Sequence, residues 1–232
     1  GGDDSIDIDA VTSIQRTSAY GGKGNDSLYM GASNTALNLT NYLQGNAGND
    51  SLVFKGSAVS STVHGGAGND TIYVGMSGSG SSVSNLVRGD LGDDNISIGH
   101  AYGASTIYGD NGTTGSSGDG GKDTISGGLI SDGMIIDAGE GNDTLVFESY
   151  NTATLYGGSG ADTINVRAGG TNKLYGDAGN DTFSIGASTT TLYGGADKDL
   201  IKTAAGTSNK LYGEADHDTI SGTGVVTLST LS

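Results

Sequence analysis

Aspartates recur along this chain with a spacing and a set of neighbours that suit metal binding. Asp70, for example, ends the segment Gly-Gly-Ala-Gly-Asn-Asp at 65–70 and is followed by Thr71 and Ile72. This pattern recurs ten times, and a truncated copy precedes it. The aspartates of these copies are Asp4, Asp26, Asp50, Asp70, Asp94, Asp123, Asp143, Asp162, Asp181, Asp199 and Asp218. Glycine turns expose main-chain carbonyls, and carbonyl and carboxylate oxygens are the ligands that Ca²⁺ prefers.

The spacing of these aspartates predicts a solenoid that places them along one edge. Successive aspartates lie 22, 24, 20, 24, 29, 20, 19, 19, 18 and 19 residues apart, and such a period is typical of stacked repeats. After each aspartate, apolar and polar residues alternate as in a half-buried strand, and a second such segment enters each glycine turn. We therefore predict an all-β fold, a right-handed parallel β-helix or β-roll of about eleven coils. It would occupy residues 1–232 as a single domain and be an excerpt of a longer protein.

Three columns of inward-facing residues are expected to form the core. The first inward residues after the aspartates are Leu28, Leu52, Ile72, Ile96, Ile125, Leu145, Ile164, Phe183, Ile201 and Ile220. The next inward residues are Met30, Phe54, Val74, Ile98, Phe147, Val166 and Ile185, with Gly127, Thr203 and Gly222 at the other copies. The strands that enter the turns contribute Leu43, Val63, Val87, Ile107, Ile136, Leu155, Leu174, Leu192 and Leu211.

In-register stacking would bring neighbouring carboxylates to about 4.8 Å from each other. Two like charges at that distance repel by about 1 kcal/mol in water, and by about 3.5 kcal/mol at an effective dielectric constant of about 20. Summed over the stack, this repulsion exceeds the roughly 5–15 kcal/mol that stabilises a typical domain. A divalent cation would remove it. Ca²⁺ suits the oxygen ligands better than Mg²⁺, which demands a tighter octahedron. Zn²⁺ is disfavoured because the chain has no Cys and only three His.

We therefore predict about ten Ca²⁺ ions along one edge of the solenoid. The predicted ligands are the aspartates of the repeats and main-chain groups of the first turn glycines, with two acidic residues from the second turn position as auxiliary ligands. Beyond the repeat aspartates, this set comprises Asp90, Asp177, Gly21, Gly45, Gly65, Gly89, Gly157, Gly176, Gly194 and Gly213.

Composition supports the need for a stabilising ion. Leu, Ile, Val and Phe total 45 of 232 residues, and the net charge is −16, values that are typical of disordered chains. The acidic balance argues against a nucleic-acid partner, which needs a basic face. With no Cys, the chain has neither disulfides nor thiolate metal sites. No apolar run approaches the roughly 18 residues that span a membrane.

The segment Gly-Gly-x-Gly-Asn-Asp-x-hydrophobic-x, as at residues 65–73, resembles the calcium-binding repeat of RTX (hemolysin-type) proteins. The resemblance implies type I secretion, export of an unfolded chain from low cytosolic calcium, and folding in calcium-rich surroundings. In the familiar RTX arrangement two nonapeptides form each coil, and metal lines both edges. Here the opposite turns, such as residues 168–172 and 186–190, carry no glycine–aspartate motif. We therefore expect calcium on one edge only, which resembles the roughly 19-residue coils of a calcium-dependent ice-binding adhesin domain.

Tyrosines precede the first turn glycine in six repeats and should point outward. They are Tyr20, Tyr108, Tyr156, Tyr175, Tyr193 and Tyr212. A glycan-binding strip is one interpretation, but simple coverage of the sheet by cross-strand pairs is the one we favour.

Several turns depart from the consensus. The expanded turn at 109–123 is either a tolerated insertion or an extra calcium or partner site. The acidic residues at the second turn position, either auxiliary ligands or solvated charges, are Asp90, Asp119, Asp177 and Glu214. Asp197 and Asp216 replace the fourth-position glycine. Because aspartate tolerates left-handed backbone, we expect these two turns to survive.

The chain has no Gly-x-Ser-x-Gly, His-Glu-x-x-His or phosphate-loop motif, so we predict that it is not an enzyme. The favoured function is a calcium-dependent structural segment of a large secreted bacterial surface protein. Its expected partners are calcium ions and other copies or domains of that protein. A folding and secretion module of a type I secreted exoenzyme is the alternative. An ice-binding surface is disfavoured because the third turn position is irregular, with Lys23, Ala47 and Leu91 among its residues.

Overall fold

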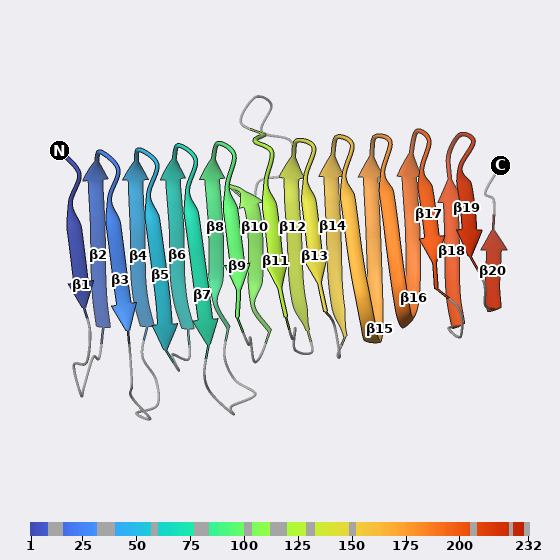
Figure 1. Cartoon of the computed structure of the whole chain (residues 1–232), viewed down its shortest axis with the longest axis horizontal. Coiled ribbons are helices and arrows are strands. Elements are labelled where there is room, and N and C mark those ends of the chain that lie inside the picture. The colour runs from blue at the N-terminus through green and yellow to red at the C-terminus, as the bar shows by residue number, and fades with distance from the viewer. Residues whose placement is uncertain are drawn as a thin grey trace.

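The computed structural model describes the chain except residues 9–15, 32–39, 57–59, 77–83, 100–103, 112–119, 129–132, 149–151, 205–207, 223–224 and 230–232. The described residues form twenty strands, β1 to β20, with no helix among them. The strands lie side by side in one elongated stack (Figure 1). A helix with the length and hydropathy needed to cross a bilayer is therefore not found in this part of the chain.

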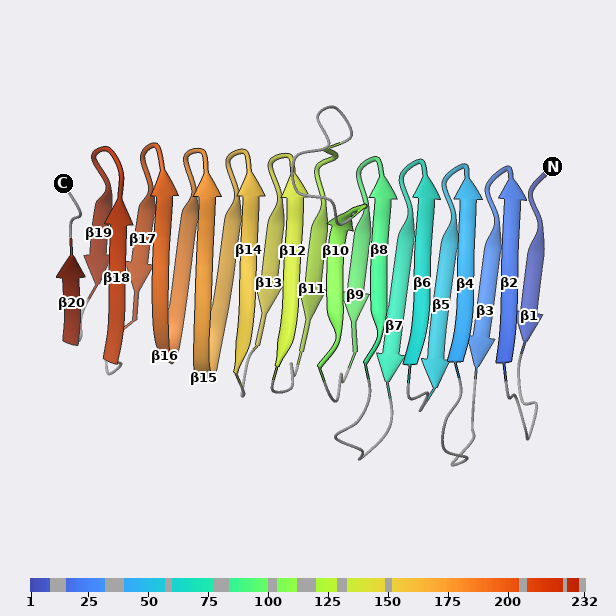
Figure 2. The same ribbon diagram turned by 180° about the vertical axis from the view of Figure 1, so that it is seen from behind.

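The strands fall into two parallel columns, one on each face of the solenoid (Figures 1 and 2). The column that leaves the glycine turns comprises β1 (Ser5–Ile8), β3 (Ser27–Gly31), β5 (Ser51–Gly56), β7 (Thr71–Met76), β9 (Asn95–Ile98), β11 (Thr124–Gly127), β13 (Thr144–Phe147), β17 (Leu200–Thr203) and β19 (Thr219–Gly222). The column that enters these turns comprises β2 (Arg16–Lys23), β4 (Thr40–Ala47), β6 (Ser60–Ala67), β8 (Leu86–Leu91), β10 (Thr106–Asp110), β12 (Met134–Glu140), β14 (Ala153–Ser159), β18 (Ser208–Glu214) and β20 (Val225–Ser229). Two long strands, β15 (Thr163–Ala178) and β16 (Thr182–Ala196), bend around the opposite edge and belong to both columns.

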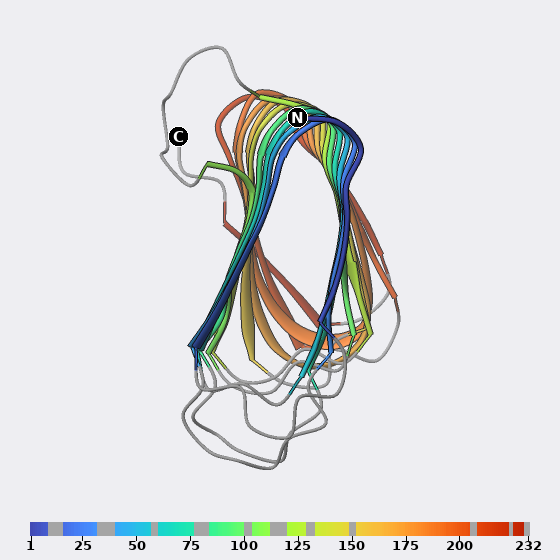
Figure 3. The same cartoon turned by 90° about the vertical axis from the view of Figure 1, so that its left-hand side faces the viewer.

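The register of the strands stacks equivalent positions of the repeat. Leu28 pairs with Leu52, and Leu52 with Ile72, in the column that leaves the turns. Leu155 pairs with Leu174 in the other column. Viewed along the stack, the two faces enclose an elongated interior and rotate gradually from coil to coil (Figure 3). The predicted parallel β-solenoid is thus confirmed.

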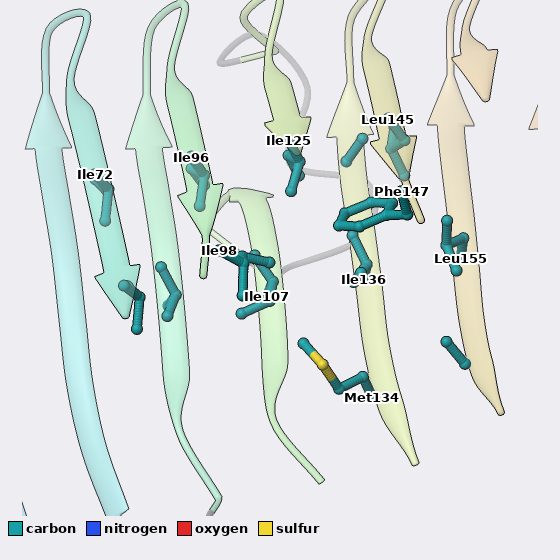
Figure 4. Close-up of a cluster of buried hydrophobic side chains, with 14 of the residues drawn as sticks. Ile72, Ile96, Ile98, Ile107, Ile125, Met134, Ile136, Leu145, Phe147 and Leu155 are labelled. Carbon is teal, nitrogen blue, oxygen red and sulfur yellow. The ribbon is translucent and has the colours of Figure 1, made fainter. Parts of the chain in front are cut away.

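The interior is filled by the predicted inward columns. Every residue of the three columns from Leu28 to Leu211 is buried except at the expected interruptions, and Ile220 is half-buried against the same core. Figure 4 shows side chains of the two faces meeting there. The gap at Gly127 is occupied by a neighbour, because a Cβ at Gly127 would lie 3.0 Å from Phe147 Cε1. Met134, Ala138 and Ala153, which the periodicity did not single out, are also in the core.

Truncating a core ring tests this packing. Phe183 is fully buried and stacks in register between Ile164 and Ile201. We expect Phe183→Ala to reduce the free energy of unfolding by about 3–5 kcal/mol, because it removes apolar contacts and leaves a cavity. Chemical unfolding in saturating calcium measures the change. The exposed neighbour Ser184 provides the control: Ser184→Ala should change stability little, and equal losses in both variants would contradict the packing.

Candidate metal centre

The sixth-position aspartates form one column along the glycine-turn edge. The nine from Asp26 to Asp199 are buried, each at most 3% exposed, whereas Asp4 is exposed and Asp218 half-buried. One oxygen of each carboxylate accepts a hydrogen bond from the N–H of the preceding coil's aspartate; Asp26 N, for example, donates to Asp50 Oδ1 at 2.7 Å. The bond repeats without interruption from Asp4 to Asp218, at 2.7–3.0 Å. These bonds satisfy main-chain donors that burial would otherwise leave unpaired.

The second oxygen of each buried carboxylate has no hydrogen-bond partner. This holds for Oδ2 of Asp26, Asp50, Asp70, Asp94, Asp123, Asp143, Asp162, Asp181 and Asp199. An ionised oxygen buried without a partner is strongly destabilising. A whole column of such atoms indicates that a cationic ligand belongs beside them.

The unpartnered oxygens converge with main-chain carbonyls in front of the first turn glycines. A Cβ atom added at Gly157 would lie 2.5 Å from Asp162 Oδ2 and 3.0 Å from the carbonyl oxygen of Gly176, in the next coil. The same pair of oxygens meets in front of Gly21, Gly45, Gly65, Gly89, Gly176 and Gly194. In front of Gly213 the three nearest atoms all belong to Asp218. Glycine keeps this oxygen-lined space open because it has no Cβ.

These donors fit calcium. Ca²⁺ binds carboxylate and carbonyl oxygens at about 2.3–2.6 Å in flexible geometry. Within the described ranges, no three His, Asp or Glu side chains gather into a metal-binding group. The aspartate Oδ2 atoms and the glycine carbonyls would hold the ion, and its positive charge would neutralise the column when bound.

One coil breaks the glycine column. Ala138 follows Asp137, which pairs with Tyr108, and precedes Gly139, which pairs with Gly158. Ala138 therefore occupies the position of Gly109 and Gly157. Its methyl group is buried and takes the place that the first turn glycine leaves free in other coils, so we expect less room for a ligand beside Asp143 in this turn.

Burial also shifts the protonation of the column. Loss of hydration raises the pKa of Asp94 and Asp143 to about 8 and the pKa of Asp70, Asp123 and Asp181 to about 7. The N–H of the preceding aspartate opposes this shift, and neighbouring carboxylates add to it. Without a cation, part of the column therefore retains protons at neutral pH.

The other special turn positions require left-handed backbone. At the fourth position, Asp197 and Asp216 adopt φ values of 73° and 69°, so these turns form without glycine, as predicted. At the second position Asn46, Asp90, Asp177 and Glu214 have φ between 71° and 81°.

The predicted auxiliary residues lie in different environments. The Asp90 carboxylate contacts His64 Nδ1 at 2.9 Å, and Asp177 is exposed on β15. Asp119 lies outside the described residues. The assignment of Asp119 to the second turn position needs correction, because Asp110 is the residue in register with Asp90. Asp110 Oδ2 accepts a hydrogen bond from Glu140 N at 2.6 Å, so it links the expanded turn to the turn of the following coil.

A second ladder on this edge was missed by the sequence analysis. The fifth turn position uses side-chain oxygens to accept N–H groups of the following coil, as when Asn49 N donates to Asn25 Oδ1 at 2.8 Å. Further steps involve Asn49, Asn69, Asp93, Asn142 and Asn180 as acceptors. This ladder runs in the opposite sense to the aspartate ladder. The recurrence of Asn before the aspartate was the available signal.

The opposite edge of the solenoid has a ladder of hydrogen bonds to uncharged side chains. Its buried polar residues are Asn41, Ser61, Asn85, Ser105, Asn172, Thr190 and Asn209. Ser61 N donates to Asn85 Oδ1 at 2.8 Å, and Thr190 N donates to Asn209 Oδ1 at 3.1 Å. An uncharged amide therefore suffices for a bond of this kind. The carboxylates of the glycine edge supply an additional charged oxygen that the coil itself does not need, which points to metal binding on that edge.

The family comparison agrees with this geometry. A model of the RTX calcium-binding nonapeptide repeat, four copies long, matches residues 18–34, 36–53, 54–76, 135–148, 154–170, 167–201 and 206–224, more than half of the chain. No curated protein and no solved structure matches the chain. The turns that carry the buried aspartates and the first turn glycines lie largely within the matched segments. The chain belongs to the family of proteins with RTX calcium-binding nonapeptide repeats.

Proposed function

We propose that the chain is a calcium-dependent structural segment of a large secreted bacterial surface protein, such as a surface layer, an adhesin stalk or an extracellular filament. The observation that carries this proposal is the column of buried carboxylates from Asp26 to Asp199, each with one unpartnered oxygen. The same environment repeats in coil after coil. Such repetition suits a structural rod, which acts through its length and stiffness.

Calcium would couple folding to location. The cytosol holds little free calcium, so the aspartate column would keep the chain unfolded there and competent for export. Outside the cell, ions held by Asp Oδ2 and the glycine carbonyls would remove the repulsion and let the apolar columns pack. We propose about ten such ions, arranged along this one edge.

Small-angle X-ray scattering tests the proposal. In millimolar calcium we expect the scattering of a rigid rod with the cross-section of one coil, and in excess chelator that of an expanded chain. The structural role predicts that adding calcium back restores the rod fully. A rod of the same dimensions in chelator would refute calcium-dependent folding.

A further inference from the structure

Four neighbouring coils carry an ordered strip on their outer face, the tyrosine strip. Its central column is a run of tyrosines on β14, β15, β16 and β18, strands that lie side by side in Figure 2. The flanking columns are two residues before and two residues after each tyrosine. The strip comprises Tyr156, Tyr175, Tyr193 and Tyr212, flanked by Thr154, Lys173, Thr191 and Lys210 and by Gly158, Asp177, Gly195 and Glu214.

The tyrosine rings cover one another. Their centroids are 4.8, 5.0 and 4.8 Å apart along the column, with interplanar angles of 12°, 6° and 9°. Each inner ring therefore has both faces occupied by neighbours, and the part of each half-buried ring that remains accessible is its edge. A sugar stacks on the free face of an aromatic ring, so this geometry does not favour the glycan-binding interpretation. It presents a firm ridge instead.

The rows across the strip alternate in character. Lys173, Tyr175 and Asp177 form one row, and Lys210, Tyr212 and Glu214 form another. The two rows with Tyr156 and Tyr193 have threonine in place of lysine and glycine in place of the acid. The ion pairs found among the described residues are His64–Asp90 and Arg167–Glu148, so none of the four charges of the strip forms an ion pair with another described residue.

This arrangement is complementary to itself. A second copy, turned by 180° about an axis that runs along the solenoid above the tyrosines, places its Lys173 opposite Asp177 and its Lys210 opposite Glu214. In the other rows, each threonine faces a glycine, which leaves room for its methyl group. In a fully overlapping copy that runs in the opposite direction, each lysine would face a threonine and each acid a glycine, so no opposite charges would meet. A two-fold contact requires such self-complementarity of one patch.

We propose that the tyrosine strip docks a second copy of this chain, side by side, parallel and in register. The inference deepens the proposed structural function and rests on it, because the strip exists only in the folded solenoid. A four-coil patch is smaller than the ~800 Å² per partner of a stable interface. The contact is therefore weak for one pair and gains strength where many copies are held in an array.

Charge reversal at the lysines tests the contact. We expect the wild-type chain in calcium to show concentration-dependent dimerisation by sedimentation velocity, and Lys173→Glu/Lys210→Glu to remain monomeric because like charges then face each other. The matched control is Lys55→Glu/Lys202→Glu. This variant has the same net charge as the first one, but its two substituted lysines are exposed on the other face of the solenoid. It should dimerise like the wild type at a moderate salt concentration. A wild-type chain that stays monomeric up to about 1 mM, or equal association of both variants, would overturn the proposal.

Thiol crosslinking tests the orientation, because the chain has no cysteine of its own. Tyr156→Cys and Tyr212→Cys mark opposite ends of the strip. In a mixture of the two variants, a short thiol–thiol crosslinker should join like sites, 156 to 156 and 212 to 212. Crosslinks between 156 and 212 would indicate antiparallel packing and overturn the proposal. Circular dichroism of the same samples, with calcium and with chelator, separates a failure of association from a failure of calcium-dependent folding.

Discussion

The calcium-free protein is expected to become more stable as the pH falls from about 8 to about 5, whereas the calcium-loaded protein is expected to become less stable. Asp94 and Asp143 have a pKa near 8 in the folded chain, against about 3.9 for an unfolded aspartate. Between these values the folded state binds more protons than the unfolded state. Stability therefore decreases as the pH rises through this window.

Calcium reverses the sign of this dependence because it binds the deprotonated carboxylates. Lowering the pH then makes protons compete with the ions, and stability lost with the ions exceeds what protonation restores. At about pH 8 without calcium, the charged column opposes the packing of the apolar columns, and we expect most of the β-structure to be lost. At about pH 5 without calcium, protonation should restore part of it.

The experiment follows far-UV circular dichroism and urea unfolding across this pH range, in buffer freed of calcium by a chelating resin and in millimolar calcium. The predicted result is two slopes of opposite sign. Asp94→Asn provides an internal check, because asparagine can still accept the N–H of Asp70 but carries no charge. It should weaken the pH dependence of the calcium-free chain. Slopes of the same sign with and without calcium would contradict the role assigned to the column.

Periodicity was enough to predict the architecture. Apolar residues such as Leu52 and Leu155 alternate with polar ones, and burial of one face leaves a single register in which they stack. The same register brings the sixth-position aspartates into one column, so their common edge followed from the sequence. The preference for glycine and aspartate in left-handed turns likewise gave the geometry at Asp197 and Asp216.

Features that depend on contacts between coils were not predictable from one repeat. The hydrogen bond from Asp26 N to Asp50 Oδ1 requires the offset between adjacent turns, which no spacing along the chain specifies. Counting back from Asp123 selected Asp119 as the second turn residue, but strand pairing selects Asp110. An insertion shifts sequence distance without shifting the stack. Asn25 was part of the recognised motif, yet its role appears only when the next coil is placed beside it.

Adding a single methyl group at a first turn glycine is expected to change the number of bound calcium ions. Gly176→Ala should remove about one ion, because the added Cβ would overlap both Asp181 Oδ2 and the Gly194 carbonyl oxygen. The backbone tolerates alanine here, since Gly176 does not have positive φ and Ala138 already occupies the equivalent position. Loss of metal would therefore not require loss of the fold.

The reverse substitution is made in the coil that has alanine, Ala138, at the first turn position. Ala138→Gly should open the space beside Asp143 and add about one ion, or tighten a weak one, although glycine costs about 0.5–1 kcal/mol in chain entropy. Isothermal titration calorimetry, with metal analysis of dialysed protein, measures the stoichiometry in both variants. Gly128→Ala is the matched control, because a Cβ at Gly128 has no atom within 4 Å. An unchanged ion count in Gly176→Ala would mean that the ions bind away from the oxygen-lined space in front of the first turn glycines. Opposite changes in the two variants would place them between Asp Oδ2 and the next coil's carbonyl, where one methyl group decides whether a coil holds its ion.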